Sequence, residues 1–91
     1  MLAHIACMNS RQRKTLEAVF AEPTKSNIAW ADIEVLLIAS GCKVIEGSGS
    51  RVRFNHERGT FVAHRPHPQK ETKQYVVKYV RAFLSEIGVK P

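Results

Sequence analysis

The chain has 91 residues, 44% of them hydrophobic, and this length allows one small core rather than several domains. No apolar run is long enough to cross a bilayer, so we expect a soluble protein with no membrane contact. The 14 Lys and Arg against 8 Asp and Glu give a formal net charge of +6, which favours an acidic partner, either a nucleic acid or an acidic protein.

We expect residues 11–89 to form a single domain, and residues 1–10 to be disordered or outside the fold.

The two cysteines, Cys7 and Cys42, match neither a disulfide framework nor a metal-binding pair, so both are predicted to be free thiols in a reducing cytoplasm. A core this small gives marginal stability, which favours support from a partner or from a homodimer.

The first two predicted elements are helices. Residues 11–21 carry apolar side chains at helical spacing, and the helix ends before Pro23 because proline disfavours helical geometry at the preceding residue. The second helix covers residues 29–40, and Gly41 follows as its left-handed cap. Its apolar residues are predicted to lie in the core, and they are Trp30, Ile33, Leu36, Leu37 and Ile38.

Beyond Gly41 the pattern changes to short alternating runs bounded by glycine or proline, which predicts strands. The predicted strands are 43–46, 51–54 and 60–64, with a hairpin loop over 55–59, and they form an antiparallel meander. Alternation within the second strand places Arg51 and Arg53 on one face of the sheet and the apolar residues on the other.

The last predicted element is a helix that begins near Thr72 and stops at Gly88. Tyr75 and Tyr79 lie one turn apart, and we expect them to pack at the helix edge rather than to stack on bases. The solvated face of this helix is predicted to carry Gln74, Lys78 and Arg81. The sequence therefore predicts an α+β fold in the order α-α-β-β-β-α, with the helices on one face of the sheet.

The loop at residues 47–50 reads Gly-Ser-Gly-Ser and precedes two arginines. Small residues let an anion approach the backbone amides, although a flexible strand connection has the same composition. The arginines can bind phosphate oxygens in a bidentate manner, and this favours a phosphate clamp. The candidate phosphate-binding or RNA-binding residues are Gly49, Ser50, Arg51, Arg53, Arg65 and Lys70.

His64 and His67 are the candidate catalytic residues. They flank a proline at the exit of the third strand and precede the last helix. Histidine titrates near neutral pH, and cleavage of an RNA phosphodiester needs one proton removed from the 2′-hydroxyl and another delivered to the leaving oxygen. The alternative is a rigid loop whose histidines bond to the backbone. No Cys or third His stands at ligand spacing, so no metal or other cofactor is predicted.

Residues 30–89 resemble the HicA family of bacterial toxins. The resemblance rests on the order of elements, on Gly-Ser-x-x-x-Phe at 49–54 and on Pro-His-Pro-x-Lys at 66–70. It implies a fold like a double-stranded RNA-binding domain (dsRBD-like), a metal-independent endoribonuclease activity on messenger RNA, and a HicB antitoxin as partner. The helix at 11–21 is an addition at the front of this fold.

One position departs from the family pattern. The family usually reads Gly-Ser-His with a catalytic histidine, whereas Arg51 follows Gly-Ser here. Either His64 or His67 has taken over proton transfer, or Arg51 serves as a phosphate clamp in a member that binds RNA without cutting it. His67 matches a position that is often histidine in the family. A third interpretation is a domain whose basic surface docks an acidic partner.

Overall fold

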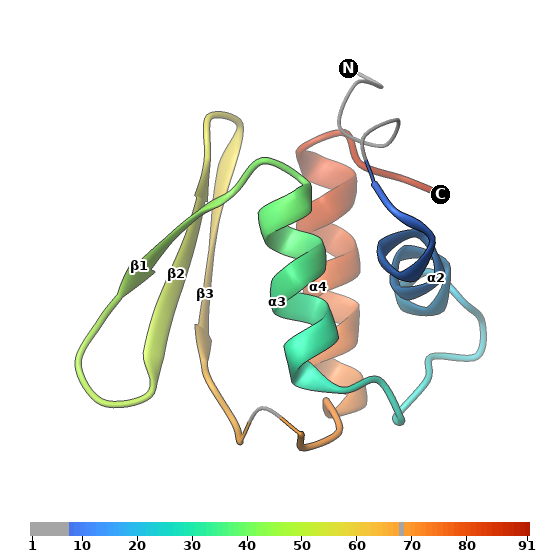
Figure 1. The fold of residues 1–91 in the computed structure, drawn as a ribbon, viewed down its shortest axis with the longest axis horizontal. Helices are drawn as coiled ribbons and strands as arrows, with labels where there is room; N and C mark the ends of the chain where they lie inside the picture. Colours follow the sequence, from blue (N-terminus) through green and yellow to red (C-terminus); the bar gives the residue numbers. More distant parts are fainter. Residues whose placement is uncertain (1–7, 68) are drawn as a thin grey trace.

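The computed structural model describes residues 8–67 and 69–91. Its elements are α2 (Ser10–Val19), α3 (Trp30–Ala39), β1 (Lys43–Glu46), β2 (Arg51–His56), β3 (Gly59–His64) and α4 (Gln74–Glu86). The strands form the antiparallel meander β1-β2-β3, so the predicted α+β fold and element order are confirmed. The sheet lies against α3 and α4, and α2 covers the far side of these two helices (Figure 1).

Residues 8–10 are part of the fold, which the sequence did not predict. Asn9 caps α2: its side chain accepts from the amide of Gln12 at 2.8 Å, and the Gln12 side chain accepts from the Asn9 amide at 3.0 Å. Met8 is buried in the core. The expectation that residues 1–10 lie outside the fold is therefore wrong for 8–10, and residues 1–7 lie outside the described residues.

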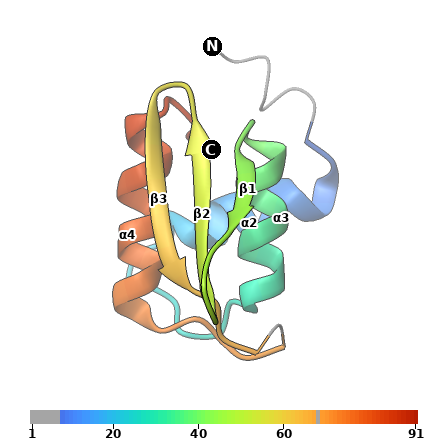
Figure 2. The ribbon, with the colours of Figure 1, turned by 90° about the vertical axis from the view of Figure 1, so that its left-hand side faces the viewer.

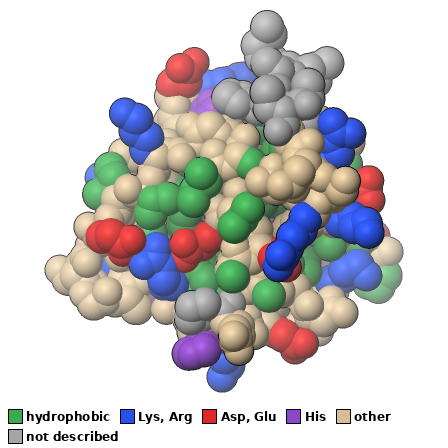
Figure 3. All heavy atoms as spheres, viewed as in Figure 1, with side chains coloured by type: hydrophobic (Ala, Val, Ile, Leu, Met, Phe, Trp, Pro, Cys, Tyr) green, Lys and Arg blue, Asp and Glu red, His purple; other side chains and the backbone are tan. Residues whose placement is uncertain are grey.

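Helix α3 is the centre of the core, with one exception to the prediction. Trp30, Leu36 and Leu37 are buried, as is Ile33, because α3 is packed between the sheet and α2. Ile38, however, is 51% exposed, because its side of the helix faces neither of these layers. Hydrophobic side chains are visible beside acidic and basic ones on the face that carries α3 (Figure 3).

The sheet follows the predicted alternation. Val52 and Phe54 are fully buried against the helices, while Arg51 and Arg53 are exposed on the opposite face. The predicted loop over 55–59 is wrong: β2 continues to His56 and β3 begins at Gly59, so that the hairpin turn has two residues. The longer pairing leaves fewer backbone groups without partners.

Helix α4 ends as predicted, at a glycine in left-handed conformation, Gly88 with φ of 88°. Arg81 does not lie on a solvated face of this helix, contrary to the prediction. Its guanidinium donates to the carbonyls of Val19 (2.9 Å) and Ala21 (3.1 Å), and it forms an ion pair with Glu22 (2.7 Å). The side chain thus supplies partners for carbonyls at the end of α2, which the helix itself cannot satisfy.

Tyr75 and Tyr79 also differ from expectation. Their rings meet edge to face at a centroid distance of 6.0 Å, but their side chains remain largely in solvent, with 58% and 62% of each residue exposed. Core packing at the helix edge therefore does not account for them. Within the described part of the chain, no helix has the length and apolar character needed to span a membrane.

Candidate active site

The face of the sheet that points away from the helices is called the outer sheet face (Figure 2). Strand register places alternate residues of the three strands on it. They are Lys43, Ile45, Arg51, Arg53, Asn55, Thr60, Val62 and His64. This face combines positive charge with exposed apolar side chains, and none of the helices α2, α3 and α4 covers it.

A pocket of about 350 Å³ lies on the outer sheet face where β1 and β2 lead into the Gly-Ser turn. Arg51 and Arg53 line it together with Ile45 and Val62. Within the turn, the amide of Gly47 donates to the Arg51 carbonyl at 2.9 Å, and the Arg51 amide donates back to the Ser48 carbonyl at 3.1 Å. These two amides are used within the turn, and Arg51 and Arg53 are the cationic residues that line the pocket and can bind an anion.

His64 lies beside this pocket, where β3 ends. The Oγ atom of Ser50 and the Nδ1 atom of His64 are 3.5 Å apart, and the Arg65 amide donates to the Ser50 carbonyl at 2.7 Å. Arg51 is the cross-strand partner of His64. The structure thus brings together three of the sequence-predicted residues, Ser50, Arg51 and His64, on one edge of the outer sheet face.

His67 lies in the turn that follows Pro66. Its Nδ1 atom accepts from the amide of Gln69 at 3.4 Å, and its carbonyl accepts from the Lys70 amide at 2.8 Å. These bonds match the rigid-loop alternative for this histidine. In the described ranges, no hydrogen bond joins His67 to His64, or to Ser50 or Arg51 beside His64.

Lys70 follows that turn, and its backbone is fixed to α3 because the Trp30 amide donates to the Lys70 carbonyl at 3.0 Å. Its side chain lines a second pocket, of about 210 Å³, at the start of α4. His64 lines this second pocket as well. His64 therefore neighbours both residues: it is the cross-strand partner of Arg51, which lines the first pocket, and it lines the second pocket together with Lys70.

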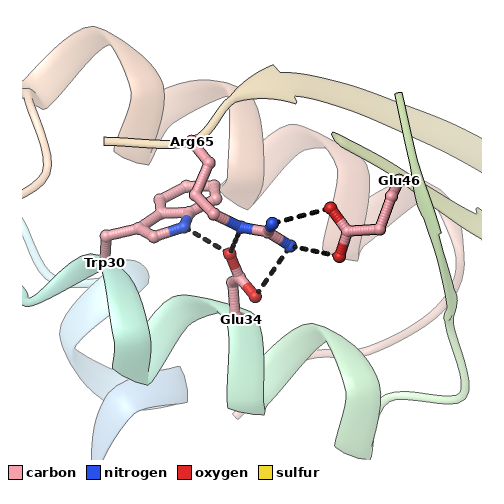
Figure 4. Close-up of polar contacts among 4 residues, drawn as sticks. All are labelled: Trp30, Glu34, Glu46 and Arg65. Carbon is pink, nitrogen blue, oxygen red and sulfur yellow. Dashed lines mark hydrogen bonds and ion pairs between the residues drawn. The ribbon is translucent and has the colours of Figure 1, made fainter. Parts of the chain in front are cut away.

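Arg65 has a different environment from the one predicted for a phosphate ligand (Figure 4). Its Nε atom donates to Oε2 of Glu34 at 2.5 Å, and its Nη1 atom donates to Oε1 of Glu46 at 2.8 Å. Glu34 also accepts from the indole Nε1 of Trp30 at 2.6 Å. The guanidinium is therefore used to join β1, the exit of β3 and α3.

The electrostatics of this network follow from its geometry. The hydrogen bond and charge of Arg65 hold the pKa of Glu46 below its usual value, and the two carboxylates raise the pKa of Arg65. Sequence reasoning missed Glu34 and Glu46 because they lie 31 and 19 residues from Arg65, at no spacing that a local pattern could reveal.

The described residues contain neither a metal-binding cluster nor a reactive cysteine. No three His, Cys, Asp or Glu side chains in the described ranges gather as ligands for a metal ion. Cys42 is a free thiol in the core, as predicted, and burial raises its pKa to about 11, which makes it a poor nucleophile. Cys7 lies outside the described residues.

Comparison with protein families gives one match. A family model described as the HicA toxin of bacterial toxin-antitoxin systems matches residues 30–89, from the start of α3 to just beyond α4. The matched stretch includes the sheet, His64 and both pockets, and it excludes α2. No curated protein and no solved structure matches the chain significantly.

Proposed function

This chain belongs to the HicA family of bacterial toxins, and we propose from this that it cleaves messenger RNA as an endoribonuclease. Membership of a toxin-antitoxin family implies an antitoxin partner. We propose a HicB-like protein in that role, one whose acidic surface covers the basic outer sheet face. The net charge of +6 and the exposed Arg51 and Arg53 support this choice.

The observation that carries the proposed activity is the pairing of Arg51 with His64. Directly opposed residues on one face of an antiparallel sheet have Cβ atoms about 4.5–5.5 Å apart. A histidine at position 64 can therefore reach the space open to a side chain at position 51, where the family pattern has its histidine. We assign proton transfer to His64 on this basis, and phosphate binding to Arg51.

The proposed reaction uses His64, Arg51 and His67 together with the 2′-hydroxyl of the RNA. His64 accepts the proton of the ribose 2′-hydroxyl, the 2′-oxygen forms a bond to phosphorus, and the bond from phosphorus to the 5′-oxygen breaks. Arg51 stabilises the negative charge that builds up on the phosphate. His67 is the candidate acid that protonates the leaving 5′-oxygen, and the products are a 2′,3′-cyclic phosphate and a 5′-hydroxyl.

The alternative function is RNA binding without cleavage. The replacement of the family histidine by Arg51 favours it, because an arginine binds phosphate but does not exchange protons near neutral pH. In that case the outer sheet face keeps its affinity for RNA, and His64 has no effect on turnover.

The test is cleavage of a defined messenger RNA in EDTA by antitoxin-free protein, with products resolved on a gel. We expect cleavage in EDTA and products ending in a 2′,3′-cyclic phosphate. Loss of a general base lowers rates by about 10²–10⁴-fold, and we expect a loss of this size for His64→Ala. His56→Ala is the matched control, since His56 lies at the other end of β2.

The outcomes separate the two functions. Intact RNA with folded protein, bound in a salt-sensitive manner, overturns the enzyme and supports the RNA-binding module. Cleavage that survives in His64→Ala but is lost in His67→Ala moves the base to His67. Circular dichroism of each variant shows that the comparison is made between folded proteins.

A further inference from the structure

Apart from His64, the residues that line the second pocket, called the α4 pocket, have no part in the proposed chemistry. The lining includes His64, Lys70, Glu71, Thr72, Lys73 and Tyr75, so that two lysines stand against one acidic residue, and the volume is about 210 Å³. This volume is below the range of about 300–1,000 Å³ that is usual for drug-sized ligands. The pocket can therefore enclose only part of a ligand, such as the phosphate of a nucleotide whose base lies over an exposed side chain at the rim.

One side of the α4 pocket suits a phosphate. Lys70 and Lys73 bring positive charge to it, and Lys73 is the N-cap residue of α4 with no side-chain hydrogen bond capping the helix. The first amides of a helix have no acceptor within it, and a helix N-terminus attracts anions.

Thr72 provides a second and independent observation. The residue is only 3% exposed, and its hydroxyl has no hydrogen-bond partner among the described residues. Buried hydroxyl groups are nearly always paired in native proteins. Thr72 is one of the residues that line the α4 pocket, so a ligand in this pocket lies beside the residue that carries the unpaired hydroxyl.

The other side of the pocket suits a base. Tyr75 lines it and is 58% exposed, and its ring meets that of Tyr79 edge to face. Exposed aromatic rings are the surfaces on which single-stranded nucleic acids stack their bases. Tyr79 is equally exposed but does not line the pocket, so the two tyrosines have different positions relative to it.

We propose that the α4 pocket binds one nucleotide of single-stranded RNA adjacent to the scissile phosphate. Lys70, Lys73 and the start of α4 hold a phosphate, and Tyr75 stacks on the base. The strand then runs from Arg51 on the outer sheet face, past His64, into this pocket. This inference rests on the proposed function and restricts its substrate to unpaired RNA, because bases in a duplex are not free to stack on a side chain.

The test measures binding of a hexanucleotide with 2′-O-methyl riboses, which cannot be cleaved, by fluorescence anisotropy at several salt concentrations. Tyr75→Ala is compared with Tyr79→Ala, the neighbouring exposed tyrosine of α4. Lys73→Gln is compared with Lys78→Gln, an exposed lysine of the same helix that does not line the pocket. The mutated side chains are exposed, so folding is expected to be retained.

We expect Tyr75→Ala to weaken binding about fivefold or more, as loss of base stacking does, with Tyr79→Ala within about twofold of the wild type. Lys73→Gln is expected to lower the salt slope by about 0.7, the value for one phosphate contact on a single strand. Lys78→Gln is expected to keep that slope. A duplex of the same sequence is expected to bind without dependence on Tyr75.

Two results distinguish failure of this inference from failure of the proposed function. If Arg51→Ala weakens binding while Tyr75→Ala and Lys73→Gln behave like their controls, RNA binds the sheet and the α4 pocket is not a nucleotide site. If the wild-type protein neither binds nor cleaves RNA, the proposed function itself is overturned. Equal losses for Tyr75→Ala and Tyr79→Ala also overturn the inference.

Discussion

Replacing Glu34 by alanine removes the carboxylate at the centre of the Arg65 network. Glu34 accepts from Arg65 and from the indole of Trp30, and its side chain is 20% exposed. Loss of hydrogen bonds to a charged group costs about 1.5–3 kcal/mol, and a buried donor left without an acceptor costs about 1–3 kcal/mol. Both losses come from one carboxylate and do not add fully, so we expect Glu34→Ala to lower the free energy of unfolding by about 2–4 kcal/mol.

The assay is urea unfolding followed by circular dichroism, with thermal unfolding beside it. For a domain of this size, 1 kcal/mol shifts Tm by roughly 4–8 °C, so Glu34→Ala is expected to lower Tm by about 8 °C or more. Glu34→Gln keeps an acceptor for the indole of Trp30 but not the charge, so its Tm is expected to lie between those of the wild type and Glu34→Ala. Glu17→Ala, an exposed change in α2, is the control and should stay within about 0.5 kcal/mol of the wild type.

Glu46→Ala tests the same reasoning from the other carboxylate. Glu46 also binds Arg65, but its side chain is 66% exposed, so water screens the pair and replaces the lost bonds. We therefore expect a clearly smaller loss of stability than for Glu34→Ala. A loss as large as that of Glu34→Ala, or a Glu34→Ala protein as stable as Glu17→Ala, refutes the argument that burial determines the strength of this network.

Three further predictions concern the acid range, the first helix and the free thiol. The lowered pKa of Glu46 means that its contribution to stability is complete above the usual value of 4.5 and is lost as pH falls through the lower folded value, so Tm measured between about pH 6 and pH 3 should fall more steeply for the wild type than for Glu46→Gln. Asn9→Ala removes the capping box of α2 and should cost about 1 kcal/mol in urea unfolding, whereas no loss would place residues 8–10 outside the cooperative unit. Cys42 should react with iodoacetamide only after unfolding, because its thiol is buried and its pKa is raised to about 11; rapid modification of Cys42 in the native protein, located by mass spectrometry of its peptide and kept apart from any reaction at Cys7, would contradict this.

The parts of the fold that sequence predicted are those governed by local periodicity. Alternation over residues 51–54 predicted the two faces of β2, and Gly88 predicted the end of α4, where the structure has it in left-handed conformation. Local rules could not place Ile38, because its exposure depends on which sides of α3 the sheet and α2 cover. The length of the β2-β3 hairpin also depended on pairing across strands rather than on the composition of the loop.

The candidate site shows the same division. Arg51 and His64 were predicted as site residues from their residue types. That they lie directly opposite each other depends on the register of β2 and β3, which local sequence patterns do not determine. Arg65 was assigned to phosphate because it is an arginine in a basic region. The carboxylates that engage it come from α3 and from the end of β1, so its actual use is a tertiary property.

The bonds from Arg81 to the end of α2 also determine how the molecule comes apart. They join residues 62 and 60 positions apart in sequence, and they connect the first layer of the protein to its last helix. Detaching α2 alone would break these bonds and would expose Leu16 and Val19, which are buried in the core. We therefore expect α2 to unfold together with the core rather than by itself, although it lies outside the stretch that matches the family model.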